Sequence, residues 1–433
     1  MRERETGTSW LWAFAPINAS VGIFFTLLPL YILNLGGNVV DVGVITSAYL
    51  LSLVPGALVW GYIIEYFPHR KGYIAFSYIG MGAILAIIYS FNRLGLFSFF
   101  LAFYGFVSAA AAPAVSLLIM ESFAKRSWPD MVAKLSFASM IGYDAGIITG
   151  FLWTSFYKLD GLIALSALLS MFSGALVLKL VREPKLVFER KAILFSRELF
   201  THRLRVLPVL IFGLPTLRQY RRFLQMLRLT FLREVPLLYF SVFIFDLGAN
   251  IFGTSYVPAL KQNYISDNEI FLITLSNSVT QTVAFLYIHR KRFFERYMVV
   301  DSTEWVLAIR AAIFLTTTII IALFRGGSLM AINLIVFSAI GGSWAFYNTA
   351  VSSLVFRTLD SQRQGEILGI YSSIGGLFSF TGALASGYLS YTLGYSVTFL
   401  AAGTLMVVSL YLLNLSAKIG ERVRLLHDII TYG

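Results

Sequence analysis

Ile244-Phe-Asp-Leu-Gly-Ala-Asn-Ile-Phe-Gly-Thr254 lies in the middle of a long apolar segment, where a carboxylate is unexpected. The stretch Pro16-Ile-Asn-Ala-Ser-Val-Gly-Ile-Phe-Phe-Thr26, 228 positions earlier, matches it. Both stretches end in Ile-Phe-x-Thr, and Asn18 aligns with Asp246. This self-similarity predicts that one structural unit is used twice in the chain.

The repeat continues along both halves of the chain. Ile45-Thr46 aligns with Ile273-Thr274 at the same offset of 228 positions. Ala114-Val-Ser116 aligns with Ala350-Val-Ser352 at an offset of 236. The change from 228 to 236 indicates about eight additional residues in the second half. Each half is therefore expected to contain the same segments in the same order.

The composition indicates a polytopic membrane protein. The 433 residues are 58% hydrophobic and 13% charged, whereas a soluble domain carries about 25% charged residues. The absence of cysteine excludes a disulfide framework, a thiolate metal site and a cysteine nucleophile. The net charge of +12 is attributed to basic loops, and nucleic-acid binding is not expected because no recognition motif accompanies the charge.

Twelve apolar segments are long enough to cross a membrane, which requires about 20 residues each. They are continuous, so we expect helices, because barrel strands would alternate over about ten residues. The first is read as a transmembrane helix and not as a removed signal peptide. The expected spans are Trp10–Leu33, Val42–Tyr62, Tyr73–Ser90, Leu94–Met120, Ser136–Phe156, Leu162–Val181, Val235–Tyr256, Ile270–Ile288, Val306–Phe324, Leu329–Phe356, Ile367–Leu389 and Val397–Leu415.

The positive charge predicts the orientation. With both termini on one side, 29 of the 34 Lys and Arg residues lie on that side, which the positive-inside rule assigns to the cytoplasm. The expected parts are a six-helix bundle over residues 1–185, a basic cytoplasmic linker over 186–233, a second six-helix bundle over 234–416 and a cytoplasmic tail over 417–433. In the linker, Thr216–Glu234 favours a helix on an anionic leaflet, although a merely basic connection remains an alternative.

A local motif follows the second span. Gly61-Tyr-Ile-Ile-Glu65-Tyr-Phe-Pro-His-Arg70-Lys71 has a glycine, an acid four residues later and a basic end. Gly61 would allow close helix approach. Glu65 can meet a neighbouring helix N-terminus, with Arg70 as its counter-charge. An ordinary helix end with basic flanks is the alternative interpretation.

Six plus six repeated spans, a long central loop and this motif resemble the major facilitator superfamily of secondary transporters. Ala112-Pro-Ala-Val-Ser116, followed by Glu121, is also similar to the family. The resemblance implies that Gly61, Glu65, Arg70 and Lys71 form a cytoplasmic latch between the halves. The fifth span departs from the antiporter pattern of the family, because Ile147 stands where proline is expected within Gly142-x-x-x-Gly146-x-x-x-Gly150.

The resemblance also implies a central cavity near the midplane, lined by spans one, four, seven and ten. The repeat then places Asn18 and Asp246 opposite each other across it. A carboxylate at that depth costs about 3 kcal/mol or more unless it is paired or hydrated, so Asp246 is the leading functional residue. Asn250 lies one turn further along the same helix face and could hold the carboxylate or the substrate.

Other polar residues within the spans are candidates with structural alternatives. Asp144 could be a second site or a gate residue. Arg310 is expected to snorkel to the cytoplasmic surface or to pair with Glu304, and a role as an anchor for a substrate anion is the alternative. The remaining candidate substrate residues are Trp344, Tyr347, Asn348, Asn277 and Gln281. The four histidines, His69, His202, His289 and His427, lie in expected loops or tails, so no metal site is predicted.

We therefore expect a multi-pass plasma-membrane transporter that moves a small organic solute by alternating access. Because burial favours the uncharged form of a carboxyl group, coupling to protons is expected, with no cofactor beyond the ion gradient. The expected partners are the solute and the lipid bilayer, and the protein is expected to be a monomer. A non-transporting sensor or receptor, a membrane-embedded enzyme and a channel are the alternatives, although neither a catalytic constellation nor a filter loop appears in the sequence.

Overall fold

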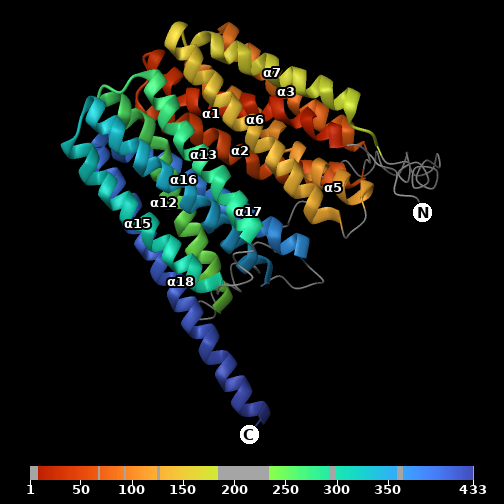
Figure 1. Ribbon diagram of the computed structural model, residues 1–433, viewed down its shortest axis with the longest axis vertical. Coiled ribbons are helices and arrows are strands. Elements are labelled where there is room, and N and C mark those ends of the chain that lie inside the picture. The colour runs from red at the N-terminus through yellow and green to blue at the C-terminus, as the bar shows by residue number, and fades with distance from the viewer. Residues whose placement is uncertain are drawn as a thin grey trace. The chain divides into compact units, whose positions relative to one another are not determined.

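A computed structural model describes residues 8–66, 69–91, 94–123, 127–183, 234–291, 299–357 and 364–432. These ranges contain helices and short connections and no strand. Figure 1 shows the helices with their labels. They are η1 (Thr8–Phe14), α1 (Ala15–Asn34), α2 (Val39–Tyr66), α3 (Arg70–Phe91), α4 (Leu94–Ser108), α5 (Ala111–Ser122), α6 (Trp128–Phe156), α7 (Asp160–Leu180), α12 (Glu234–Gln262), α13 (Asp267–Lys291), α15 (Val299–Leu323), α16 (Gly326–Arg357), α17 (Gln364–Leu393) and α18 (Tyr395–Tyr432).

The fold prediction is confirmed. A helix covers each of the twelve expected spans, with α4 and α5 sharing the fourth. Within the described ranges, eleven segments are long and apolar enough to cross a membrane. The twelfth helix, α17, is 30 residues long and covers the expected eleventh span.

The fourth span is interrupted, which the sequence analysis did not predict. The helix breaks between α4 and α5 at Ala109 and Ala110. Ala110 donates its backbone N–H to Val107 O at 3.2 Å, in a tighter turn than an α-helix. Pro113 lies four residues after Ala109 and has no N–H to donate to that carbonyl, which accounts for the break.

The chain divides into two compact units. Unit 1 comprises residues 1–31 and 51–216, and unit 2 comprises residues 32–50 and 217–433. The first half of α2 belongs to unit 2 because it packs on α17. A Cβ atom added at Gly43 would lie 2.9 Å from Ala383 O and from Gly387 Cα. This close approach of two helix backbones requires small residues on both sides.

Equivalent glycine contacts in the two units support the sequence repeat. In unit 1, a Cβ atom at Gly146 of α6 would collide with the backbone of Ala19 in α1. In unit 2, a Cβ atom at Gly382 of α17 would lie 2.5 Å from the carbonyl oxygen of Leu247 in α12. Gly382 is 236 positions after Gly146, and Leu247 is 228 positions after Ala19. Both offsets are those found in the sequence.

Serine hydrogen bonds follow the same pattern. Ser173 of α7 donates to Ala13 O in unit 1. In unit 2, Ser409 of α18 donates to Ser241 O of α12 at 2.8 Å. The same two offsets relate these pairs. Buried serine hydroxyls therefore join the first helical segment of each unit to its last, as is common between helices in a membrane.

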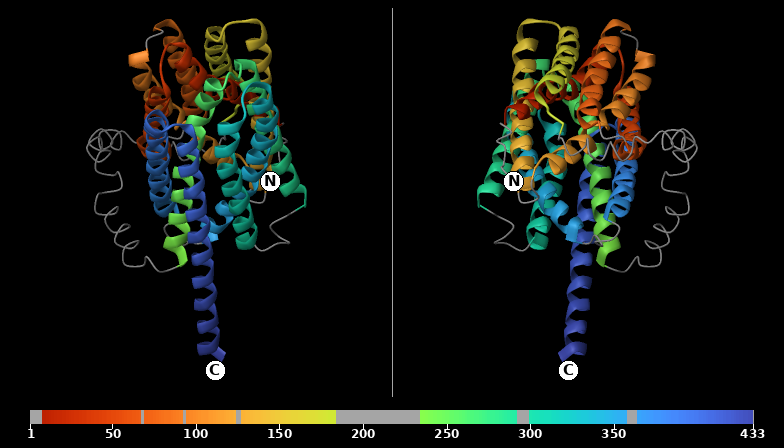
Figure 2. Two further views of the ribbon diagram at one scale, coloured as in Figure 1. Left: turned by 90° about the vertical axis from the view of Figure 1, so that its left-hand side faces the viewer. Right: turned by 90° about the vertical axis from the view of Figure 1, so that its right-hand side faces the viewer.

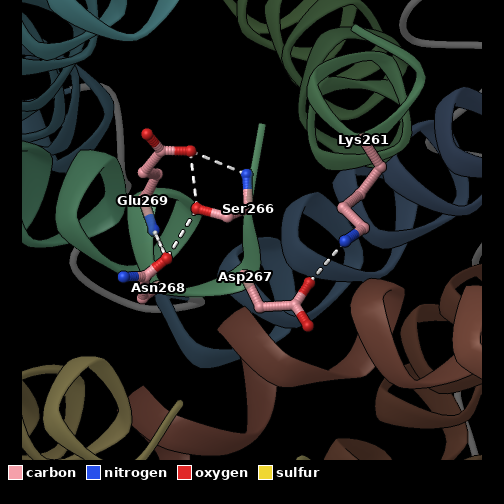
Figure 3. A network of polar contacts seen from close by, with 5 residues as sticks. All are labelled: Lys261, Ser266, Asp267, Asn268 and Glu269. Carbon is pink, nitrogen blue, oxygen red and sulfur yellow. Dashed lines mark hydrogen bonds and ion pairs between the residues drawn. The ribbon is translucent and has the colours of Figure 1, made fainter. Parts of the chain in front are cut away.

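The helix starts of α2 and α13 are also equivalent. Figure 3 shows the one at α13, where the backbone N–H of Ser266 donates to Glu269 Oε2 at 2.8 Å. At the start of α2, the backbone N–H of Asn38 donates to Asp41 Oδ2 at 2.7 Å. Asn38 also accepts a hydrogen bond at Oδ1 from the N–H of Val40 at 2.8 Å. Each is a capping box, in which the third residue of the helix reaches back to the cap.

The core of unit 2 is aromatic. Phe252 of α12 stacks on Phe314 of α15 with ring centroids 4.0 Å apart, and also contacts Phe399 of α18 at 5.0 Å. One turn further, Tyr256 stacks on Phe337 of α16 at 4.3 Å. These rings join α12 to three neighbouring helices, and such pairs contribute about 0.5–1.5 kcal/mol each beyond their burial.

The last helix, α18, continues past its apolar part. Its membrane-span candidate is Tyr395–Ile419, and the helix reaches Tyr432. Figure 2 shows this extension projecting beyond the other helices of unit 2. The expected tail over 417–433 is therefore helical through residue 432. The expected linker over 186–233, including its surface helix, lies outside the described residues.

Candidate functional site

Asp246 lies near the middle of α12 and is half-buried. Its carboxylate makes no hydrogen bond or ion pair with any residue that the structure describes. Gly375 of α17 faces it, since a Cβ atom added there would lie 3.3 Å from Asp246 Oδ2. The glycine leaves space beside a charged group that is expensive to bury without a partner. This arrangement fits a group that exchanges a proton or contacts a solute.

Asn250 and Asn18, the two amides expected near Asp246, each donate a hydrogen bond to the backbone carbonyl four residues earlier in the chain. Asn250 Nδ2 donates to the backbone carbonyl of Asp246 at 2.8 Å. Asn18 Nδ2 donates in the same way to Phe14 O, at 2.7 Å. The Asn250 amide N–H therefore satisfies a helix carbonyl and does not hold the Asp246 carboxylate. Asn18 and Asp246 belong to different units, so their expected position across a cavity stays a prediction.

An aromatic stack adjoins Asp246. The ring of Phe245 stacks on Tyr347 of α16 with centroids 3.8 Å apart, and on Trp344 at 6.0 Å. Two of the predicted residues of the tenth span, Trp344 and Tyr347, thus come together around a residue that the sequence analysis did not select. The third, Asn348, is exposed. Phe245 is one of 38 phenylalanines, and only its adjacency to Asp246 could have identified it.

Two tyrosines lie within electrostatic range of the carboxylate. Tyr347 of α16 and Tyr371 of α17 both interact electrostatically with Asp246. The Tyr347 hydroxyl is buried and has no hydrogen-bond partner in the described part of the chain. Tyr371 was not predicted, and its ring also contacts that of Phe243 at 5.5 Å between centroids. Two phenol groups near one acid can donate hydrogen bonds to it or to a bound solute.

The position of Arg310 differs from the one that the sequence analysis predicted. Its side chain does not snorkel, because the residue is only 3% exposed. It also makes no described ion pair with Glu304, whose carboxylate accepts a hydrogen bond from Asn414 Nδ2 at 3.2 Å. The reason is depth: α15 begins at Val299, so Arg310 lies about three turns inside the helix. At that depth it is part of the bundle interior.

Aromatic rings enclose the Arg310 guanidinium. Its Cζ lies 5.2 Å from the ring centre of Phe245, 5.5 Å from Phe314 and 5.6 Å from Trp344. Nη1 donates to Ile340 O at 3.0 Å and to Ser343 Oγ at 3.2 Å. Cation–π contacts stabilise a desolvated guanidinium by about 2 kcal/mol or more each. All of these contacts are made by neutral residues.

The remaining polar candidates lie apart from this group. Asn277 Nδ2 donates to Phe337 O at 2.8 Å and so joins α13 to α16. A Cβ atom at Gly341 of α16 would collide with the backbone of Asn277, which also indicates a packing contact. Gln281 is half-buried further along α13. Asp144 is half-buried in α6 of unit 1, where it interacts with Tyr143.

In the expected latch motif, Arg70 forms an ion pair that the sequence analysis did not predict. Arg70 Nη2 lies 2.8 Å from Glu121 Oε1, and Arg70 also donates to Ile64 O. This buried arginine joins the ends of α2, α3 and α5. The side chain of Glu65, its predicted partner, lies outside the described residues. No described atom lies within 4 Å of a Cβ atom at Gly61, so the expected close helix approach is not seen there.

A cavity of about 570 Å³ lies elsewhere in unit 2, at the end of α12. Its lining includes Lys261 of α12 and Tyr391 of α17. Lys261 Nζ forms an ion pair with Asp267 Oδ1 at 2.6 Å, shown in Figure 3. This cavity is about four helical turns from Asp246 and contains none of the predicted residues. No cluster of metal-ligating side chains occurs within the ranges that the structure describes.

Comparisons with known proteins agree with this architecture. The family model of the Major Facilitator Superfamily matches residues 11–237, just over half of the chain. The structure is similar to the nucleoside transporter NupG, with a TM-score of 0.69 and 14% identity, covering 95% of this chain and 99% of NupG. It is also similar to the xylose transporter XylE from E. coli, with a TM-score of 0.62 and 13% identity, covering 93% and 98%.

The human organic anion transporter MFSD10 has the same fold, with a TM-score of 0.60 and 13% identity, covering 95% of this chain and 100% of MFSD10. A comparison with curated proteins finds no matching sequence. The structural similarities concern the fold alone, because the identities are low. The repeat, the twelve spans and the family model together carry the assignment. The chain belongs to the major facilitator superfamily.

Proposed function

We propose that this protein is a proton-coupled secondary transporter of a small organic solute and works by alternating access. The observation that carries the proposal is Asp246, a carboxylate without a described partner in the middle of an apolar helix. In an alternating-access cycle such a group can bind a proton from one side and release it to the other. Membership in a transporter family supports the transport part of the proposal.

The chemistry around Asp246 supports a substrate class. Trp344 is half-buried and stacks with the buried rings of Phe245 and Tyr347, and Tyr371 is a half-buried tyrosine near the carboxylate. Aromatic walls with a few hydrogen-bonding groups suit an organic molecule. A carboxylate repels a dianion, so we propose a neutral or cationic solute. Nucleosides and xylose therefore belong in a substrate screen, since they are named for two proteins of similar fold.

The proposed orientation places both termini in the cytoplasm and the protein in the plasma membrane as a monomer. The distribution of Lys and Arg supports this orientation. In that orientation α12 and α15 begin at the cytoplasmic side. The buried Arg70–Glu121 ion pair of unit 1 also lies at that side. The Lys261–Asp267 pair and its cavity would then lie at the outer side.

The test uses the purified full-length protein in proteoliposomes with an acidic exterior. Labelled nucleosides, sugars, organic cations and a dicarboxylate are supplied at equal concentration inside and outside. We expect a neutral or cationic class to accumulate above equilibrium, and Asp246→Asn to abolish accumulation while exchange at equal pH continues. Asp267→Asn, which removes a carboxylate at a helix end, is the matched control and should accumulate solute normally. Accumulation by Asp246→Asn equal to that of the parent would refute the role of Asp246.

A further inference from the structure

A groove with a carboxylate at one end lies between α15 and α18 on the surface of unit 2. The two helices pack side by side, as Figure 1 shows. The groove has a volume of about 490 Å³ and is lined by Glu304, Trp305 and Ala308 of α15 and by Val407, Leu410, Tyr411 and Asn414 of α18. None of these residues belongs to the group around Asp246, so the groove is separate from the proposed transport site.

Glu304 and Asn414 form the polar end of the groove. Both residues are half-buried, and Asn414 Nδ2 donates to Glu304 Oε2 at 3.2 Å. Glu304 Oε1 and Asn414 Oδ1 accept no hydrogen bond from the residues that the structure describes. Leu178 occupies the position of Asn414 in unit 1, at the offset of 236, so the repeated fold does not require this amide. The pair therefore offers two acceptor oxygens to a ligand that carries N–H groups.

The groove changes from polar to apolar along its length. Glu304 lies about 5 Å inside the apolar span of α15, and Asn414 lies about 8 Å inside that of α18. One helical turn deeper in the membrane, Ala308 follows on α15 and Leu410 on α18. The polar end is therefore at the boundary between lipid headgroups and acyl chains. A lipid in the groove has its headgroup at Glu304 and a chain beyond Ala308.

Two exposed aromatic residues and a lysine accompany the polar end. Trp305 is 73% exposed and Tyr411 is 66% exposed. Tryptophan and tyrosine are common at the membrane interface, and their ring faces attract a cation. Lys418 is exposed one turn after Asn414 on α18, closer to the end of the helix, where its ammonium group can meet a lipid phosphate. Together these residues match a headgroup that has a positive end and a phosphate.

We propose that this groove binds one phosphatidylethanolamine molecule of the cytoplasmic leaflet. Its primary ammonium group donates hydrogen bonds to Glu304 Oε1 and Asn414 Oδ1, and one acyl chain lies along Ala308 and Leu410. A choline headgroup has no N–H to donate, and the Glu304 carboxylate repels an anionic headgroup that carries no cation. The assignment to the cytoplasmic leaflet rests on the proposed orientation, whereas the binding itself does not depend on transport.

Native mass spectrometry of the purified full-length protein identifies the lipids that it retains. The protein is incubated in detergent with equal amounts of phosphatidylethanolamine, phosphatidylcholine and phosphatidylglycerol that have identical acyl chains. We expect the parent to retain phosphatidylethanolamine over phosphatidylcholine by about fivefold, the factor for one ammonium–carboxylate pair near a surface. Glu304→Gln removes the charge and should lose this preference. Asp301→Asn removes an exposed acid near the start of α15 and, as the matched control, should keep it.

Ala308→Phe tests the acyl part of the site and leaves the carboxylate in place. Its ring would fill the groove, so we expect the protein to retain one phosphatidylethanolamine molecule fewer than the parent. Equal or weaker retention of phosphatidylethanolamine than of either other lipid by the parent would overturn the proposal. The parent preference in Glu304→Gln, or unchanged retention in Ala308→Phe, would also overturn it. None of these results bears on solute accumulation, which tests the proposed function.

Discussion

Glu121→Gln should destabilise unit 1, because it removes the anion from a buried pair. The Arg70 side chain is 6% exposed and that of Glu121 is 26% exposed, with 2.8 Å between Nη2 and Oε1. Loss of one partner costs about 3–5 kcal/mol when both are fully buried and about 0–1 kcal/mol at a surface. Because Glu121 is partly exposed, we expect Glu121→Gln to cost about 2 kcal/mol of unfolding free energy, which corresponds to a decrease of a few degrees in melting temperature.

The matched control is the Lys261–Asp267 pair. It has a similar distance, 2.6 Å, but its side chains are 35% and 30% exposed. Asp267→Asn should therefore cost less than about 1 kcal/mol. Both variants are compared with the parent by thermal unfolding of the purified protein in detergent. Equal melting temperatures for Glu121→Gln and Asp267→Asn would refute the argument that burial determines the strength of the Arg70 pair.

Three further predictions concern packing and orientation. Gly382→Leu should lower the yield of folded protein by about tenfold or abolish folding, because its side chain would collide with the Leu247 carbonyl. Fluorescent size-exclusion chromatography measures this yield. Gly253→Leu is the control, because a side chain at Gly253 would enter open space. Tyr256→Phe should cost about 1 kcal/mol in a thermal unfolding assay, since the Tyr256 hydroxyl donates to buried Asn333 Oδ1 at 2.5 Å. A C-terminal reporter that fluoresces only in the cytoplasm should be bright, and a dark fusion to well-expressed protein would contradict the proposed orientation.

Much of the fold could be predicted from the sequence. Apolar length located all twelve spans, and the two offsets in the repeat correspond to real contacts, such as Gly146 on Ala19 and Gly382 on Leu247. These features are local or periodic, so they can be recognised from the sequence alone. The sequence analysis missed the break between α4 and α5, although Pro113 indicated it. The length of an apolar segment is the same whether or not one of its residues lacks a backbone N–H.

The side-chain partners were harder to predict, because they depend on distances between helices. The sequence analysis considered only the nearby Glu65 as a partner of Arg70 and missed Glu121 of α5, which the structure places 2.8 Å from Arg70. Arg310 was placed near the surface because the span was taken to begin at Val306, and α15 begins earlier, at Val299. Asn277 was a candidate for substrate contact, yet its amide joins two helices.

Proton movement driven by solute tests the central claim, that Asp246 couples transport to protons. Proteoliposomes hold a pH-sensitive dye at equal pH on both sides, and the solute found by the screen is added outside. The parent protein should acidify the interior as solute enters down its gradient, and Asp246→Asn should transport solute without changing the dye signal. A full dye response in Asp246→Asn, with solute flux equal to that of the parent, would contradict the account.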